Sequence, residues 1–100
     1  MKANTQLIKA IMVTALLVYA TAAQAAGDPD AGREKARACA GCHGLDGKGR
    51  IPLADQTAGY LEEQLRAYRN RTRSDETMNA IAKQLDDQDI ADLAAYYASQ

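Results

Sequence analysis

The feature that most constrains this chain is a five-residue segment, Cys39-Ala40-Gly41-Cys42-His43, which contains both cysteines and the one histidine of the sequence. Two thiols three positions apart lie on one face of a helical turn, and the next residue places an imidazole beside them. The pattern C-x-x-C-H is the attachment signature of c-type haem. Each thiol forms a thioether to a haem vinyl group, and the histidine becomes the proximal ligand of the iron.

Three alternatives use the same side chains. A disulfide between Cys39 and Cys42 suits an oxidising compartment, but it closes a very small loop and adds little stability. A thioredoxin-like dithiol belongs in a βαβ context, whereas this chain has no β-branched run typical of a strand. A zinc site needs further ligands, and the chain contains no other Cys or His. The motif therefore predicts one covalently bound haem c.

The first quarter of the chain has the pattern of an export signal. Two lysines lie near its start, residues 10–23 are apolar or small apart from two threonines, and a small-x-small triplet ends at Ala25. A transmembrane anchor is the alternative, but the apolar run is shorter than the roughly 20 residues that span a bilayer. The pattern predicts a signal peptide over residues 1–25, which is removed, and a periplasmic location for residues 26–100.

The remaining domain, residues 26–100, is too small to depend on side chains alone. A domain below about 80 residues rarely gains enough stability from one hydrophobic core, and this one has no Phe or Trp. A bound haem would complete the core. Without Lys2 and Lys9 the chain has 10 Lys and Arg against 13 Asp and Glu, a net charge of −3. This balance gives no reason to expect a nucleic-acid partner, and no apolar run after residue 25 is long enough to span a membrane.

The pattern of residues 26–100 is helical. Asp28 and Pro29 form a helix start, strong helix formers follow, and Gly32 among them indicates close approach of another helix. Residues 44–52 are rich in turn formers and predict a loop. Apolar residues at helical spacing predict the later helices. The predicted helices are Ala31–Ala40, Tyr60–Tyr68, a short one over Met78–Leu85, and Asp86 to about Ser99. The predicted fold is all-α, with about four short helices wrapped around a covalently attached haem.

Met78 is the candidate for the second axial ligand of the iron. It carries the one thioether after residue 25, because Met1 and Met12 belong to the export segment. A soft thioether favours ferrous iron and raises the reduction potential. The alternative is that Met78 fills a gap in the core, which would leave the iron five-coordinate and open to small molecules.

These features together resemble a known family. The segment from Cys39 to Gly44, the loop with Pro52, a later methionine and the closing helix Ile90–Tyr97 look like class I cytochrome c. The similarity is greatest to small bacterial monohaem members, which are similar to single halves of tandem di-haem cytochromes. It covers essentially all of residues 26–100.

The resemblance implies a role for each site residue. Cys39 and Cys42 would carry the haem thioethers, and His43 and Met78 would be the axial ligands of the iron. The Pro52 carbonyl would accept a hydrogen bond from the other ring nitrogen of His43 and so fix the ring.

The resemblance also implies a helix crossing. The first and last helices would cross near Gly32, against Leu93 and one of the two adjacent tyrosines that follow it. The chain departs from many relatives at Lys35, where they often have an apolar or aromatic residue, and at Asp55, where they often have glycine.

The expected function is the shuttling of single electrons. An iron held on both sides by protein has no open position for a substrate, so we expect a carrier and not an enzyme. Its partners would be a donor and an acceptor protein, such as a membrane oxidoreductase or a terminal reductase or oxidase. Four arginines before Met78 either steer acidic partners or form an ordinary solvated surface: Arg66, Arg69, Arg71 and Arg73. The alternatives are a haem subunit of a larger dehydrogenase or flavocytochrome complex, and a haem sensor or small enzyme with an open iron.

Overall fold

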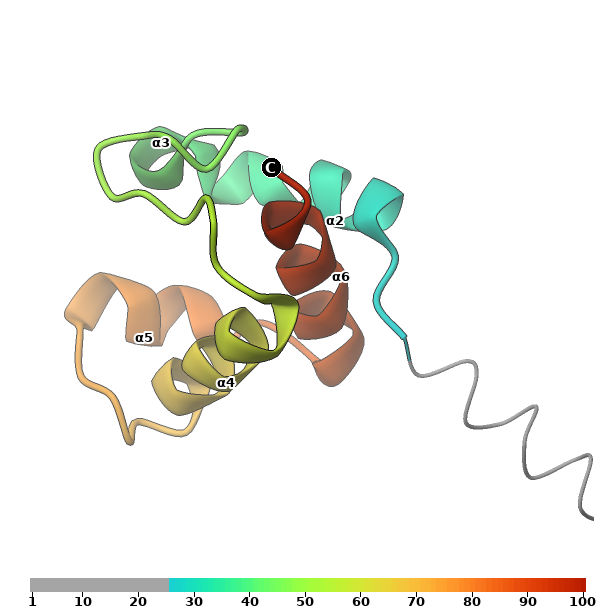
Figure 1. The fold of residues 1–100 in the computed structure, drawn as a ribbon. Helices are drawn as coiled ribbons and strands as arrows, with labels where there is room; N and C mark the ends of the chain where they lie inside the picture. The colour runs from blue at the N-terminus through green and yellow to red at the C-terminus, as the bar shows by residue number, and fades with distance from the viewer. Residues whose placement is uncertain (1–25) are drawn as a thin grey trace, which may run out of the picture.

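The computed structural model describes residues 26–100, and these residues form helices with no strand among them. The helices are α2 (Pro29–Lys35), the 3-10 helix η1 (Ala36–Ala38), α3 (Ala40–His43), α4 (Ala58–Arg69), α5 (Glu76–Ala82) and α6 (Asp87–Ala98) (Figure 1). The prediction of an all-α fold is confirmed. The predicted signal peptide, residues 1–25, lies outside the described residues.

The predicted first helix is divided into shorter pieces. It starts as expected, because the Asp28 side chain caps α2 by accepting a backbone hydrogen bond of 2.9 Å from its first turn. The prediction of one helix over Ala31–Ala40 is wrong, since α2 ends at Lys35 and a 3-10 turn follows. In a 3-10 turn residues i and i+3 are eclipsed. Cys39 therefore faces the same side as Ala36, and both pack in the core.

α2 crosses α6 at Gly32, as the resemblance implied. A Cβ atom at Gly32 would lie 2.0 Å from the Asp92 carbonyl oxygen and 2.7 Å from the Tyr96 Cβ atom. No side chain fits in that space, so only glycine allows the two helix backbones to approach this closely. Packing of the two helices offsets the cost of a glycine within α2.

Lys35 makes a second connection between the same two helices. Its Nζ lies 2.7 Å from Asp92 Oδ2 and 2.9 Å from Asp89 Oδ1. The other carboxylate oxygen of Asp92 accepts hydrogen bonds of 2.8 Å from the Asp28 N–H and from the Gln88 amide. Asp92 is only 3% exposed. A lysine is accommodated here because α6 supplies carboxylates where an apolar partner would otherwise pack.

α6 begins and packs as its sequence predicts. The Asp86 side chain accepts from the Asp89 N–H at 2.7 Å, and the Asp89 side chain accepts from the Asp86 N–H at 3.0 Å, which forms a capping box. The predicted apolar stripe is buried: Ile90, Leu93, Ala94 and Tyr97. α4 and α5 also form where expected, but α5 ends at Ala82, before the predicted end at Leu85.

The buried side chains form a thin layer along α6. One of its members comes from η1, one from α4 and the rest from α6: Ala36, Leu61, Leu93, Ala94, Tyr96 and Tyr97. Figure 1 shows α3 and its following loop on one side, and α4 with α5 on the other. A cavity lies between the two sides, since its lining residues come from α3 and the following loop as well as from α4, α5 and α6, and it contains the candidate site.

Replacing Gly32 by alanine tests the helix crossing. Gly32→Ala is expected to lower the free energy of unfolding by about 3 kcal/mol or more, because the new Cβ atom overlaps the α6 backbone. Urea unfolding of the purified protein measures the change. Gly59→Ala is the control, because nothing lies within 4 Å of its Cβ position on α4; it should be neutral or stabilising by up to about 1 kcal/mol. Equal effects of the two substitutions would contradict the crossing.

The Asp92 carboxylate predicts a dependence of stability on pH. Burial raises the pKa of Asp92, but hydrogen bonds from the Asp28 N–H, Lys35 and Gln88 outweigh burial and lower the pKa to about 2. A carboxyl group with a lower pKa in the folded state stabilises the fold above its unfolded pKa of about 4, and this contribution is lost as the pH falls towards about 2.

Asp92→Asn is therefore expected to lower the urea midpoint at pH 7, by an amount that shrinks as the pH falls from about 4 to about 2. Urea titrations across this range measure the difference from the wild type. Glu63→Gln, at an exposed position of α4, is the control and should show no such convergence. A difference for Asp92→Asn that stays constant with pH would contradict the assignment.

Candidate functional site

The two cysteines lie at one edge of a central cavity. Cys39 immediately precedes α3, Cys42 lies within it, and the His43 N–H closes the turn by donating to the Cys39 carbonyl at 3.0 Å. Both cysteines are free thiols that line the same cavity, so the alternative of a disulfide between them is not formed. Burial raises the pKa of the Cys39 thiol.

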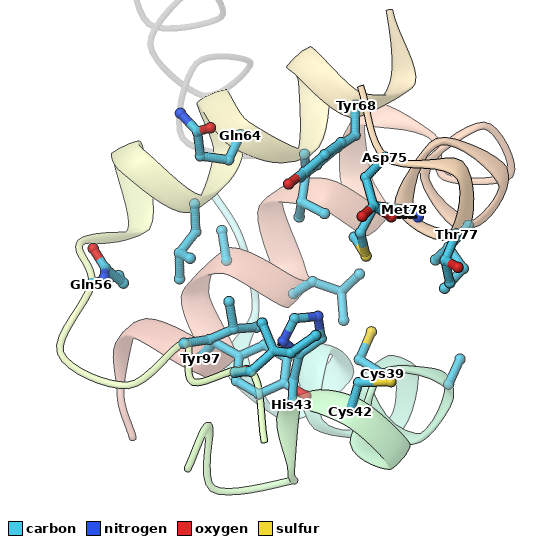
Figure 2. Close-up of a pocket in the computed structure, with 18 of the residues that line it drawn as sticks. Cys39, Cys42, His43, Gln56, Gln64, Tyr68, Asp75, Thr77, Met78 and Tyr97 are labelled. Atoms are coloured by element: carbon cyan, nitrogen blue, oxygen red, sulfur yellow. Dashed lines mark hydrogen bonds between the residues drawn. The ribbon is translucent and has the colours of Figure 1, made fainter. Parts of the chain in front are cut away.

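His43 points one ring nitrogen at the protein and the other into the cavity. The ring is buried, and Nδ1 lies 2.7 Å from the Ile51 carbonyl oxygen. Because a carbonyl oxygen can only accept, Nδ1 donates in this contact, and in the neutral ring the lone pair is then on Nε2. Figure 2 shows the imidazole facing the cavity near Cys39. His43 is thus oriented and in the tautomer that a metal ligand requires.

The predicted partner of His43 is wrong by one residue. The acceptor is the Ile51 carbonyl and not the Pro52 carbonyl. Ile51 is held on its other side as well, because its N–H donates to the Cys42 carbonyl at 2.9 Å. Pro52 disfavours helical backbone at the preceding residue, and it lines the cavity itself.

Two kinds of contact hold the loop after His43: close packing at Gly49 and hydrogen bonds from two tyrosine hydroxyl groups. At Gly49 a Cβ atom would lie 2.5 Å from the His43 carbonyl carbon, so the loop passes directly over the motif and needs glycine there. The Tyr97 hydroxyl donates to the Gly44 carbonyl at 2.9 Å, and the Tyr96 hydroxyl donates to the Leu45 carbonyl. The sequence predicted these tyrosines only as packing residues, since their hydroxyl partners are more than 50 positions away.

Met78 lies on the opposite wall. It belongs to the first turn of α5, where its N–H donates to the Asp75 side chain at 2.8 Å. Figure 2 shows its sulfur pointing into the cavity, towards the side that carries His43 and Cys39. The fold therefore brings together all four side chains that the sequence singled out, although Met78 comes from a separate helix.

The cavity fits a covalently attached haem. Its volume is about 480 Å³, within the range of about 300–1,000 Å³ typical of cofactor pockets. Two thiols lie at one edge, and an imidazole nitrogen and a thioether sulfur face it from different walls. Much of the remaining lining is apolar: Leu53, Leu61, Leu65, Ile81, Leu85, Leu93 and Ala94. No cluster of three His, Cys, Asp or Glu side chains that could hold a metal ion occurs within residues 26–100.

The four predicted arginines do not act as one group. Arg66 pairs with Glu62 at 3.5 Å and Arg69 with Asp87 at 2.8 Å. Arg73 lines the cavity and stacks 4.8 Å above the centre of the Tyr68 ring.

A further arginine was missed by the sequence interpretation. Arg50 lines the cavity, and its Nη2 lies 3.7 Å from Cys42 Sγ. No sequence pattern signals this contact, because it depends on how the loop returns to α3.

Comparison with known proteins shows what this chain is similar to in sequence. The cytochrome c family profile matches residues 29–100. Cytochrome c-554(548) of Halomonas halodenitrificans is 46% identical over 82 residues, which are 75% of this chain and 99% of that protein. Cytochrome c4 of Pseudomonas aeruginosa is 44% identical over 82 residues, which are 78% of this chain and 41% of that protein.

A solved structure is similar to this chain in fold as well as in sequence. Cytochrome c4 from Pseudomonas stutzeri superposes with a TM-score of 0.70 at 35% identity, covering 75% of this chain and 46% of that one. The chain thus spans nearly the whole of one relative and less than half of the two cytochromes c4. The family profile, the relatives and the fold lead to one conclusion: the chain belongs to the cytochrome c family, as a small class I c-type cytochrome related to the di-haem cytochromes, and its cofactor is covalently bound haem c.

Proposed function

We propose that this protein is a periplasmic electron carrier whose haem iron is ligated by His43 and Met78. The observation that supports this most is that the two side chains face one cavity from separate helices, with both cysteines at its edge. The bound haem supplies a one-electron iron couple. With His43 and Met78 both bound to the iron, no position would be left for a substrate, which favours electron transfer over catalysis.

Each residue of the site has a distinct task in this proposal. Cys39 and Cys42 would hold the cofactor covalently. His43 Nε2 and the Met78 sulfur would hold the iron, and the soft thioether would favour the ferrous state. The hydrogen bond from His43 Nδ1 to the Ile51 carbonyl keeps the ring from turning and increases the basicity of Nε2.

The walls of the cavity limit change at the site. Much of the lining is apolar, so fewer polar groups must reorganise when the charge at the centre changes. Two of the helices that supply its walls are capped at their N-termini by Thr57 and Asp75. A site with fixed ligands and fixed walls changes little when an electron arrives, which suits fast transfer.

The cavity opening is where electrons would pass. Ile51 and Tyr60 line the cavity and are 51% and 46% exposed. Arg50 and Arg73 line it as well, and they add positive charge to a domain that is acidic as a whole. The expected partners are a donor protein and an acceptor protein that approach this opening in turn.

The domain boundary after residue 25 suits export and cleavage. At Gly27 a Cβ atom would lie 2.1 Å from the Ala91 carbonyl oxygen, so the chain already packs against α6 at this point. Among residues 26–100 no helix is long and apolar enough to cross a membrane. The close packing at Gly27 supports a domain that begins at about residue 26.

The alternative of a permanent subunit has less support. A permanent interface usually needs a large apolar surface. Within the described part of the chain the exposed large apolar side chains are only Leu45, Ile51 and Tyr60. Copurification with a flavoprotein or dehydrogenase would favour this alternative over a free carrier.

The visible spectrum tests the ligation. The oxidised wild type is expected to be low-spin, with a weak sulfur-to-iron band and no spectral shift with carbon monoxide after reduction. Met78→Ala should lose the sulfur band, bind carbon monoxide and have a lower reduction potential, because the thioether is gone. Thr77→Ser, at a neighbouring cavity residue, is the control and should keep the band. A high-spin wild type that binds carbon monoxide would contradict the carrier and favour the open-iron sensor.

Removing the thiols tests the covalent attachment. Cys39→Ala and Cys42→Ala should each leave one thioether, so the reduced pyridine derivative should absorb at a longer wavelength than that of the wild type, because one vinyl group stays unsaturated. The double variant should release its haem on a denaturing gel. Haem that remains covalently attached in the double variant would contradict these assignments.

A further inference from the structure

Asn79 is a buried amide next to the candidate ligand. It is 7% exposed, follows Met78 directly and does not line the cavity. Its Oδ1 accepts from the Asp75 N–H at 2.9 Å, and its Nδ2 donates to the Tyr68 carbonyl at 2.8 Å and to the Arg73 carbonyl at 2.9 Å. The acceptor and both donors of one carboxamide are therefore used.

These three hydrogen bonds join three segments of the chain. Tyr68 is near the end of α4, Arg73 is in the irregular loop that follows, and Asp75 caps α5. The loop has no regular structure of its own and contains Arg71 at φ +62°, a conformation that favours glycine. Backbone hydrogen bonds from Arg71 and Arg73 to the Tyr68 and Ala67 carbonyls hold the first part of this path. Asn79 contacts both ends of the path and its middle.

The same contacts reach the backbone of Met78. The Asp75 side chain accepts from the Met78 N–H at 2.8 Å, while the Asp75 N–H donates to Asn79. The Asn79 N–H in turn donates to the Asp75 carbonyl at 2.8 Å. Met78 is thus held by Asp75, and Asp75 is held at two backbone atoms by Asn79.

We propose that Asn79 is a positioning residue that keeps the Met78 sulfur at the cavity and so sets how often the bond between Met78 and the iron opens. This inference rests on the proposed ligation of the iron by Met78. Asparagine is required because aspartate cannot donate to the two carbonyls, and alanine makes none of the three contacts. Loss of these contacts would leave the part-buried Tyr68 and Arg73 carbonyls and the Asp75 N–H without this partner, and moving the loop away from α4 would let water replace it.

Competition by imidazole measures the opening. Imidazole binds the oxidised haem protein only when Met78 has left the iron, so its apparent affinity rises in proportion to the open fraction. In the full-length haem-loaded protein, Asn79→Ala and Asn79→Asp are expected to bind imidazole at least about tenfold more tightly than the wild type, which corresponds to about 1.4 kcal/mol. The sulfur-to-iron band should also disappear at a lower temperature than the helical circular dichroism signal.

A control variant separates this role from general destabilisation. Asp86→Ala removes the cap of α6, which is a different helix from the one that carries Met78, and it should lower the urea midpoint without raising the affinity for imidazole. Asn79→Ser serves as a smaller change if Asn79→Ala does not fold. Variants of Asn79 that bind imidazole like the wild type, or no more tightly than Asp86→Ala, would overturn the role of Asn79 alone. A wild type that binds imidazole as tightly as Met78→Ala would overturn the ligation by Met78 as well.

Discussion

The crossing of α2 and α6 at Gly32 is the contact on which the rest of the site depends. α2 leads through η1 to Cys39, and α6 carries the tyrosine hydroxyls that hold the loop after His43. With no room for a Cβ atom at Gly32, backbone contact sets the distance between the two helices. Lys35 and Asp92 add a polar connection beside this contact. One pair of helices therefore positions both sides of the haem-binding motif.

The interior of this small domain is organised around a cavity. Ile90 is its one large side chain with essentially no exposure among the described residues, and the cavity has a volume of about 480 Å³. A domain of this size buries too little apolar surface to be very stable alone. A covalently bound cofactor would stabilise the folded state, because the residues that line the cavity come from α3, α4, α5 and α6. A small side-chain core and a central cofactor cavity thus occur together in this domain.

Local patterns predicted most of the helices and the part of the site that the C-x-x-C-H motif supplies. The capping residues, the apolar stripe of α6 and the C-x-x-C-H motif are local, so they could be found without a structure. The break of the first helix after Lys35 could not be predicted, because every residue up to Ala40 is compatible with a helix. Asp55 adopts φ +66°, a left-handed conformation that explains why glycine suits this position.

The sequence by itself determined the helical class, the covalent attachment motif and the identity of the candidate ligands, because these follow from residue types and spacings along a few turns. Only the tertiary structure decided that Ile51 and not Pro52 contacts His43, that the α6 tyrosines hold the loop after the motif, and that Asn79 holds the segment with Met78. These contacts connect backbone carbonyls to side chains on other elements. Every residue has a carbonyl, so no residue type marks which one is used, and the choice is made only when the chain has folded.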